Sequence, residues 1–161
     1  MVAQVERRRI FSHLTKTRFL HIEDSLALGK LRFFAGSYEQ GKGSNLTAYA
    51  FMDLLDARVL LSDLSWGRAI NFKDFKGGRN GNGSAISRVL KIQTREEKVW
   101  IELQNGPGEM SDGVIKPHGP MTEISIPLTI FEGRKLGHAC LAYFLAWDMF
   151  GLQLMPRGEI N

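Results

Sequence analysis

The chain contains one sequence pattern twice, and this internal repeat constrains its fold more than any other feature. Residues 17–35 (TRFLHIEDSLALGKLRFFA) and 87–103 (SRVLKIQTREEKVWIEL) each hold an Arg-x-Leu-x-Ile segment, a short turn, and a Lys that begins a second alternating segment. A third pair of blocks follows at 53–60 (DLLDARVL) and 129–136 (TIFEGRKL), and the three pairs are 70, 68 and 76 residues apart. We therefore predict a tandem duplication of one strand-rich unit that ends in a helix.

Alternating apolar and polar residues predict the strands of both units and the face that each side chain occupies. In the first unit, residues 7–14 fit an opening edge strand, and alternation places Leu20, Ile22, Leu31, Phe33, Ala35, Ala48 and Ala50 inward. In the second unit we expect strands at 69–75, 87–94, 98–105 and 122–126. The glycine-rich residues 76–84 fit a mobile hairpin tip and 106–120 a long loop, because both stretches are rich in turn-forming residues.

A helix is expected at the end of each unit. Asp53 is a suitable N-cap for the first helix, and Gly67 marks its end. Thr129 and Glu132 form a capping box at the start of the second helix, which should run from about residue 130 to 150 and stop at Gly151. Gly133 and Gly137 share one face of this helix, where they permit close approach of another backbone.

These elements predict an α+β protein of two tandem β4α units, with antiparallel sheets and helices packed on one face. We expect one domain made of two repeats, about 5–66 and about 68–150, followed by a tail at 151–161. The single cysteine, Cys140, excludes an internal disulfide framework and fits a buried thiol in a reducing compartment. No apolar run approaches the roughly 18 residues of a spanning helix, and the N-terminus lacks a secretory signal. We expect an intracellular protein of the cytoplasm or nucleoid, and the Arg-rich start leaves an organelle open.

The outward faces of the predicted strands combine cations with aromatic rings. The formal net charge of +4 favours an acidic partner, although a modestly basic protein can also be merely soluble. Cations contact phosphates and flat rings stack on unstacked bases, so such a face suits a single strand of nucleic acid. In the alternative interpretation, the rings form the core of a sandwich and the cations lie at its solvated rim. The candidate nucleic-acid-binding residues are Phe19, His21, Lys30, Arg32, Phe34, Tyr49, Lys91, Lys98 and Trp100.

This order of elements resembles that of a known family. Residues 87–150, with a hairpin that begins Arg-x-hydrophobic-x-hydrophobic, the segment Ile124-Ser125-Ile126 and a capped helix, are similar to the transcriptional coactivator family called positive cofactor four. Two such units in one chain resemble the Whirly family and its relatives among kinetoplastid mitochondrial guide-RNA-binding proteins. The resemblance implies two β-β-β-β-α units that bind single-stranded nucleic acid along their sheets. It implies contacts by Lys30, Arg32, Phe34, Lys91, Lys98 and Trp100.

Three functions therefore compete. The favoured one is a single-stranded DNA-binding protein of low sequence specificity, acting in replication, repair, recombination or transcription. The second is an RNA-binding protein of the same fold, and the third is a structural or protein-interaction module. We expect no enzyme, cofactor or metal, because His13, His21, His118 and His138 lack metal-ligand spacing. Apolar residues on the second helix predict a homo-oligomer, a dimer or tetramer.

Overall fold

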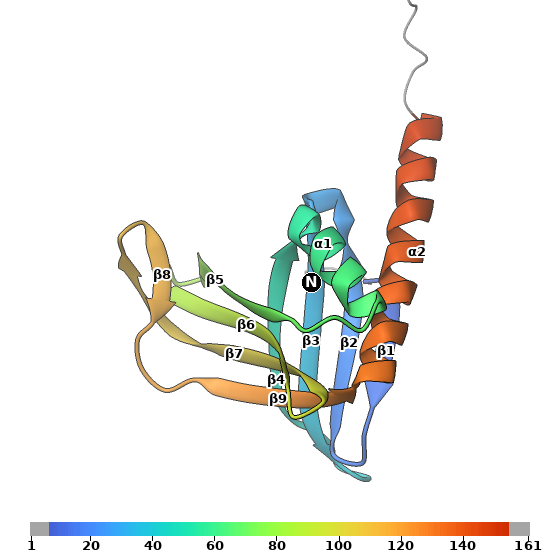
Figure 1. Cartoon of the computed structure of the whole chain (residues 1–161). Helices are drawn as coiled ribbons and strands as arrows, with labels where there is room; N and C mark the ends of the chain where they lie inside the picture. Colours follow the sequence, from blue (N-terminus) through green and yellow to red (C-terminus); the bar gives the residue numbers. More distant parts are fainter. Residues whose placement is uncertain (1–6, 155–161) are drawn as a thin grey trace, which may run out of the picture.

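The computed structural model describes residues 7–154, which form an α+β fold of two antiparallel sheets and two α-helices (Figure 1). The predicted start of the first unit at residue 5 and most of the predicted tail, residues 155–161, lie outside the described residues. Within the described part of the chain, no helix is long and apolar enough to cross a membrane. The predicted α+β class with antiparallel sheets is confirmed.

The first sheet and the helix after it come from the first part of the chain. Its strands are neighbours in sequence order and all pair antiparallel, as the alternating segments predicted. Helix α1 starts directly after the last strand, and a short 3-10 helix η1 joins the second strand to the third. The elements are β1 (Arg9–Leu14), β2 (Arg18–Ser25), η1 (Leu26–Leu28), β3 (Lys30–Glu39), β4 (Gly43–Asp53) and α1 (Leu54–Ser65).

The second sheet follows, and a long helix completes the described chain. Strand β7 lies between β6 and β9, while its far half pairs with the short strand β8. In Figure 1 the β7–β8 end lies on the side of the molecule opposite α2. The elements are β5 (Asn71–Arg79), β6 (Ala85–Arg95), β7 (Lys98–Ser111), β8 (Val114–Pro117), β9 (Thr122–Thr129) and α2 (Ile130–Leu154).

Two predicted loops are in part strands. Residues 76–79 belong to β5 and pair with β6, so the prediction of an unpacked tip from 76 to 84 was wrong at its beginning. The predicted loop at 106–120 contains the end of β7 and all of β8. The glycines serve close packing here, because a Cβ at Gly77 or Gly108 would lie 2.2 or 2.5 Å from side-chain carbons of Ile115. A larger residue at either position would collide with β8.

One hydrophobic core joins both sheets to both helices. The inward residues predicted in the first sheet are at most 2% exposed, which confirms the predicted faces. The prediction of close approach at Gly137 is also confirmed, because a Cβ there would lie 2.6 Å from the Leu61 carbonyl oxygen of α1. The thiol of Cys140 is fully buried in this core, as predicted, and burial raises its pKa to about 12.

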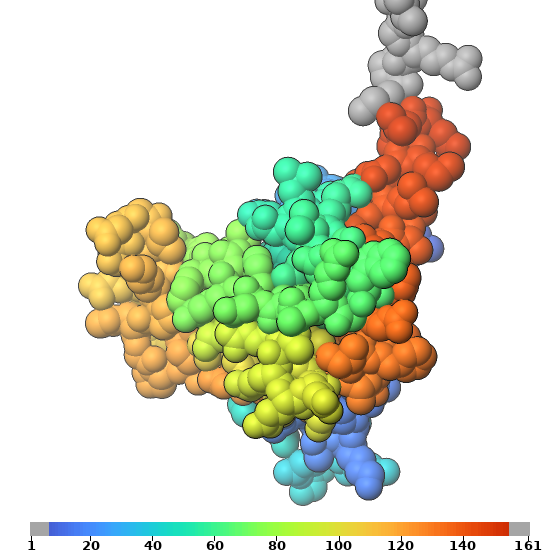
Figure 2. All heavy atoms as spheres, in the orientation of Figure 1, coloured from blue at the N-terminus to red at the C-terminus, as the bar shows by residue number. Residues whose placement is uncertain are grey.

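The helix ends follow the predictions in part. The capping box is confirmed, since the Thr129 amide donates to Glu132 Oε2 at 2.8 Å and the Glu132 amide donates to Thr129 Oγ1 at 3.1 Å. Helix α2 continues through Gly151 to Leu154, so the predicted end was wrong; one glycine costs a helix only about 1 kcal/mol. Figure 2 shows this C-terminal part of α2 extending beyond the rest of the molecule.

The N-cap predicted at Asp53 is correct in position and wrong in chemistry. Asp53 has extended backbone directly before α1, but within residues 7–154 its side chain makes no capping hydrogen bond. Its carboxylate binds two lysines instead, which places Asp53 in the site described next.

Candidate functional site

The predicted site residues occupy two surfaces, one on each sheet. All nine lie outside the buried core, which occupies the opposite, helix-covered faces of the sheets. We call the outer side of the first sheet the aromatic face; it carries Phe19, His21, Lys30, Arg32, Phe34, Tyr38, Tyr49 and Phe51. We call the outer side of the second sheet the polar face; it carries Asn71, Lys91, Gln93, Arg95, Lys98, Trp100, Glu102, Gln104 and Glu123.

Rings from three strands meet on the aromatic face because His21, Phe34 and Tyr49 are direct cross-strand neighbours. The Phe19 ring centroid lies 4.9 Å from that of His21 and 5.4 Å from that of Phe34. Tyr49 contacts Phe51 edge to face at 5.8 Å. All five rings are half-buried. Each therefore keeps accessible surface on a rigid sheet, where an unstacked nucleic-acid base can contact it.

Arg32 lies between these rings. Its guanidinium carbon is 4.8 Å from the ring centroids of both Phe34 and Tyr49, and Nη1 donates to Glu23 Oε1 at 2.6 Å. The side chains of Arg32 and Glu23 are each 12% exposed. Burial lowers the pKa of Arg32, although Glu23 opposes the shift. The guanidinium of Arg32 is therefore packed between two rings and paired with Glu23. It is less available to bind a phosphate than the sequence suggested.

Arg88 extends this stack to the second sheet. It projects from β6, where its Nη2 donates to the Tyr49 hydroxyl at 2.9 Å, and its guanidinium carbon lies 4.8 Å from the Tyr49 ring centroid. The Asn105 side chain fixes the same crossing, since it accepts from the Tyr49 amide at 2.9 Å and donates to the Tyr49 carbonyl at 2.7 Å. The aromatic face thus ends at a rigid junction between the sheets.

A groove opens at this junction, and we call it the inter-sheet groove. It has a volume of about 440 Å³ and is lined by Leu28, Lys30, Phe51, Lys76, Gly77 and Arg88. Asp53 lies beside it, where its carboxylate accepts hydrogen bonds from Lys30 and, at 3.0 Å, from Lys76. Lys76 also forms an ion pair with Asp74 at 3.0 Å. Three cations and one aromatic ring therefore line a space of the size that small ligands and nucleotide groups occupy.

These ion pairs shift two pKa values. Hydrogen bonds from Lys30 and then Lys76 lower the pKa of Asp53. Burial works to lower the pKa of Lys76, but its contacts with Asp53 and Asp74 outweigh burial and raise this pKa. Both groups are therefore charged at neutral pH.

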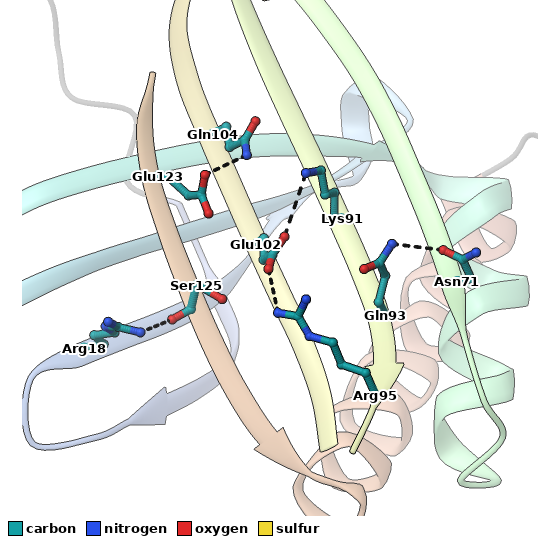
Figure 3. A network of polar contacts seen from close by, with 9 residues as sticks. All are labelled: Arg18, Asn71, Lys91, Gln93, Arg95, Glu102, Gln104, Glu123 and Ser125. Atoms are coloured by element: carbon teal, nitrogen blue, oxygen red, sulfur yellow. Dashed lines mark hydrogen bonds and ion pairs between the residues drawn. The ribbon is translucent and has the colours of Figure 1, made fainter. Parts of the chain in front are cut away.

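The polar face is a ladder of hydrogen bonds and ion pairs whose side chains lie on the side of the second sheet away from the helices (Figure 3). Glu102 accepts from Arg95 at 2.9 Å and lies 4.0 Å from Lys91, while Gln93 donates to Asn71 at 3.1 Å. Arg95 covers the Trp100 ring at 4.8 Å. Of the three residues predicted here, Lys91 therefore lies beside the carboxylate of Glu102, and the ring of Trp100 is covered by Arg95. Lys98 is exposed, and no ion pair involves it in residues 7–154.

The histidines lie in separate places. His21 belongs to the aromatic face, where its Nδ1 lies 2.8 Å from Ser12 Oγ; burial and then Arg9 lower its pKa. His118 contacts Glu109 on the β7–β8 end at 3.0 Å, and His138 is exposed on α2. Over residues 7–154, no group of three or more His, Cys, Asp or Glu side chains is placed to hold a metal ion.

Sequence reasoning missed Phe51, Asp53, Lys76 and Arg88 as site residues. Phe51 could have been predicted, because it lies two residues after Tyr49 in an alternating strand and therefore on the same face. Asp53 lies on this face too and pairs with Lys30 within the first sheet. Its contact with Lys76, and the positions of Lys76 and Arg88, depend on how the two sheets cross, and alternation within one strand carries no information about that crossing. No family model, curated protein sequence or solved structure matches this chain.

Proposed function

We propose that the protein binds single-stranded DNA with low sequence specificity, and that it serves DNA replication, repair, recombination or transcription. One observation carries the proposal: the aromatic face combines half-buried rings with interleaved guanidinium groups on a sheet surface that the helices leave open. Rings of this kind stack on bases whatever their identity. The adjoining cations neutralise phosphates, so affinity does not require hydrogen bonds to base edges. Duplex DNA hides the faces of its bases and suits this surface less well.

We further propose that the chain is two tandem β4α units of the Whirly and positive cofactor four type, with β8 as an insertion in the second unit. Reciprocal arginine contacts support this. Arg18 of β2 donates to the Ser125 carbonyl of β9 at 2.5 Å, while its repeat counterpart Arg88 of β6 donates to Tyr49 of β4. Tyr49 and Ser125 are 76 residues apart, the same spacing as the third pair of repeated blocks. Equivalent arginines thus contact equivalent positions in the other unit.

Binding of RNA by the same surfaces is the second candidate. The polar face favours it, because the amide side chains of Asn71, Gln93 and Gln104 can exchange hydrogen bonds with 2′-hydroxyl groups. The third interpretation, a structural or protein-interaction module, predicts indifference to oligonucleotides. We propose no catalytic role and no cofactor, and we place the protein inside the cell, in the cytoplasm, nucleoid or an organelle.

The helix layer suits self-association. Large apolar side chains are exposed on both helices: Leu55, Val59, Phe131, Leu145, Met149, Phe150, Leu152 and Leu154. A monomer leaves this surface in water, whereas a second copy covers it. We propose a homo-oligomer, a dimer or tetramer, packed through the helices so that the aromatic faces remain open.

Fluorescence anisotropy tests the proposed function. Labelled single-stranded DNA, duplex DNA and single-stranded RNA of equal length are titrated with the full chain at several salt concentrations. We expect tight binding to single strands that weakens steeply with salt. Each neutralised phosphate of a single strand adds about 0.7 to the steepness with which the logarithm of the binding constant falls against the logarithm of the salt concentration. The ratio of DNA to RNA affinity decides between the first two candidates. Absence of binding at low salt contradicts both and supports the interaction module.

A further inference from the structure

Asp53 joins the two sheets at the inter-sheet groove. It occupies the N-cap position of α1, yet within the described chain its carboxylate makes no bond to the helix amides. Instead it binds Lys30 of β3, in the first sheet, and Lys76 of β5, in the second. A residue type suited to capping therefore serves a different contact, one that brings two like charges from different sheets to the same point.

The two lysines remain accessible to a ligand. The side chains of Lys30 and Lys76 are 36% and 24% exposed, and that of Asp53 is 43% exposed. Both lysines line the groove together with Arg88. The groove thus brings three cations to one space, and two of them, the lysines, are partly exposed.

The chemistry of Asp53 matches that of a phosphodiester. Both present two oxygens that share one negative charge, and both accept charge-assisted hydrogen bonds from ammonium groups. A phosphate in the groove therefore competes with Asp53 for the same two lysines. The negative charge of Asp53 also repels an incoming phosphate at this short range.

We propose that Lys30, Lys76 and Arg88 form a phosphodiester-binding site in the inter-sheet groove, and that Asp53 acts as an internal competitor that weakens this site. The inference rests on the proposed function. It means that the sugar-phosphate backbone of the bound nucleic acid runs through the inter-sheet groove, past the end of the aromatic face. Asp53 tunes affinity downward, which allows a protein of low sequence specificity to release a strand.

The substitution Asp53→Asn tests this site with a labelled oligothymidylate in anisotropy titrations. Asn keeps the side-chain shape and removes the competing charge. We expect affinity to increase about two- to fivefold, the factor that corresponds to one exposed charge pair. The salt dependence should become steeper, because Lys30 and Lys76 then contact phosphate in place of Asp53.

Further variants separate the site from general charge effects. Lys76→Gln should weaken binding more than Lys135→Gln, which removes the same charge from the exposed helix layer. In the double variant Asp53→Asn/Lys76→Gln, most of the gain from Asp53→Asn should disappear. Lys76→Gln keeps the test decisive even if Asp53→Asn lowers the thermal stability.

The outcomes separate the two proposals. Binding by the unaltered protein that Asp53→Asn leaves unchanged or weakens overturns the competitor role, while the proposed function stands. Equal losses in Lys76→Gln and Lys135→Gln overturn the phosphate site. If neither the unaltered protein nor Asp53→Asn binds the oligothymidylate at low salt, both proposals are wrong.

Discussion

Arg32 shows how a cation on a candidate binding surface can serve its architecture. Glu23 and two rings enclose the guanidinium, and its Nε is buried without a hydrogen-bond partner in the described chain. The ion pair holds the guanidinium against Phe34 and Tyr49, which are cross-strand neighbours, so both rings keep defined positions. Preorganised rings lose little conformational entropy when a base stacks on them.

Glu23→Gln is therefore expected to destabilise the protein. The substitution leaves the Arg32 charge mostly buried and unpaired, which should lower the free energy of unfolding by about 1.5–3 kcal/mol. Urea denaturation measures this change. Glu39→Gln is the matched control, because Glu39 pairs with Lys42 on the open surface, and its cost should stay below about 0.5 kcal/mol. Equal costs for the two variants contradict the role given to the Glu23–Arg32 pair.

The lowered pKa of Asp53 predicts a dependence of stability on pH. A carboxylate with a depressed folded-state pKa contributes stability that is present above its ordinary value of 3.8 and is lost as pH falls through the folded value. The difference in melting temperature between the unaltered protein and Asp53→Asn should therefore shrink below about pH 4. Thermal melts between pH 7 and pH 3 measure it. A difference that stays constant over this range contradicts the assigned ion pairs.

At the scale of elements, the second sheet is longer than the alternating segments suggested. Strands β5, β7 and β8 form an extension in which Gly77 and Gly108 contact Ile115 closely. The extension places Lys76 and Gly77 beside Lys30 and Phe51. The packing of β8 therefore contributes to the shape of the inter-sheet groove.

Gly77→Ala should disturb this extension. The added methyl group would lie 2.2 Å from the Ile115 Cβ, so β8 has to shift, at a cost of about 1–3 kcal/mol in the free energy of unfolding. Chemical denaturation measures the cost. Gly81→Ala provides the comparison, because a Cβ at Gly81 meets nothing within 4 Å and its φ is not positive. A fully stable Gly77→Ala variant shows that β8 is not packed as described.

The sequence predicted correctly which face of its strand a side chain occupies, but it did not predict the contacts between the two sheets. Alternation placed Leu20, Phe33 and Ala50 in the core, because the face of a strand depends only on residue parity. The contact of Asp53 with Lys76 could not be predicted in this way. Lys76 reaches Asp53 through the crossing of two sheets, and its surroundings of glycine and charge looked like a loop. Cross-sheet pairs need the three-dimensional arrangement.

At the scale of the whole molecule, the two candidate binding faces and the helix layer lie on different sides of the sheets. This separation lets the proposed self-association and the proposed strand binding use different surfaces. In the proposed assembly, several copies of the aromatic face would contact one long strand at several points, which raises the apparent affinity without new contacts.

Sedimentation at micromolar concentration should therefore give a mass above that of the 18.1 kDa chain. Leu145→Glu combined with Met149→Glu should reduce this mass, because two charges replace exposed apolar side chains on one face of α2. A monomer mass for the unaltered chain contradicts the proposed assembly.

The most direct test of strand binding by the aromatic face compares substitutions of phenylalanines on two surfaces. Anisotropy titrations with a labelled oligothymidylate are performed on the unaltered chain, on Phe19→Leu combined with Phe34→Leu, and on Phe131→Leu of the exposed helix layer. Stacking contributes about 1–3 kcal/mol per base, so the double substitution on the aromatic face should weaken binding about tenfold or more. Phe131→Leu should change the affinity little. Equal affinities for all three proteins would show that the aromatic face does not hold the strand.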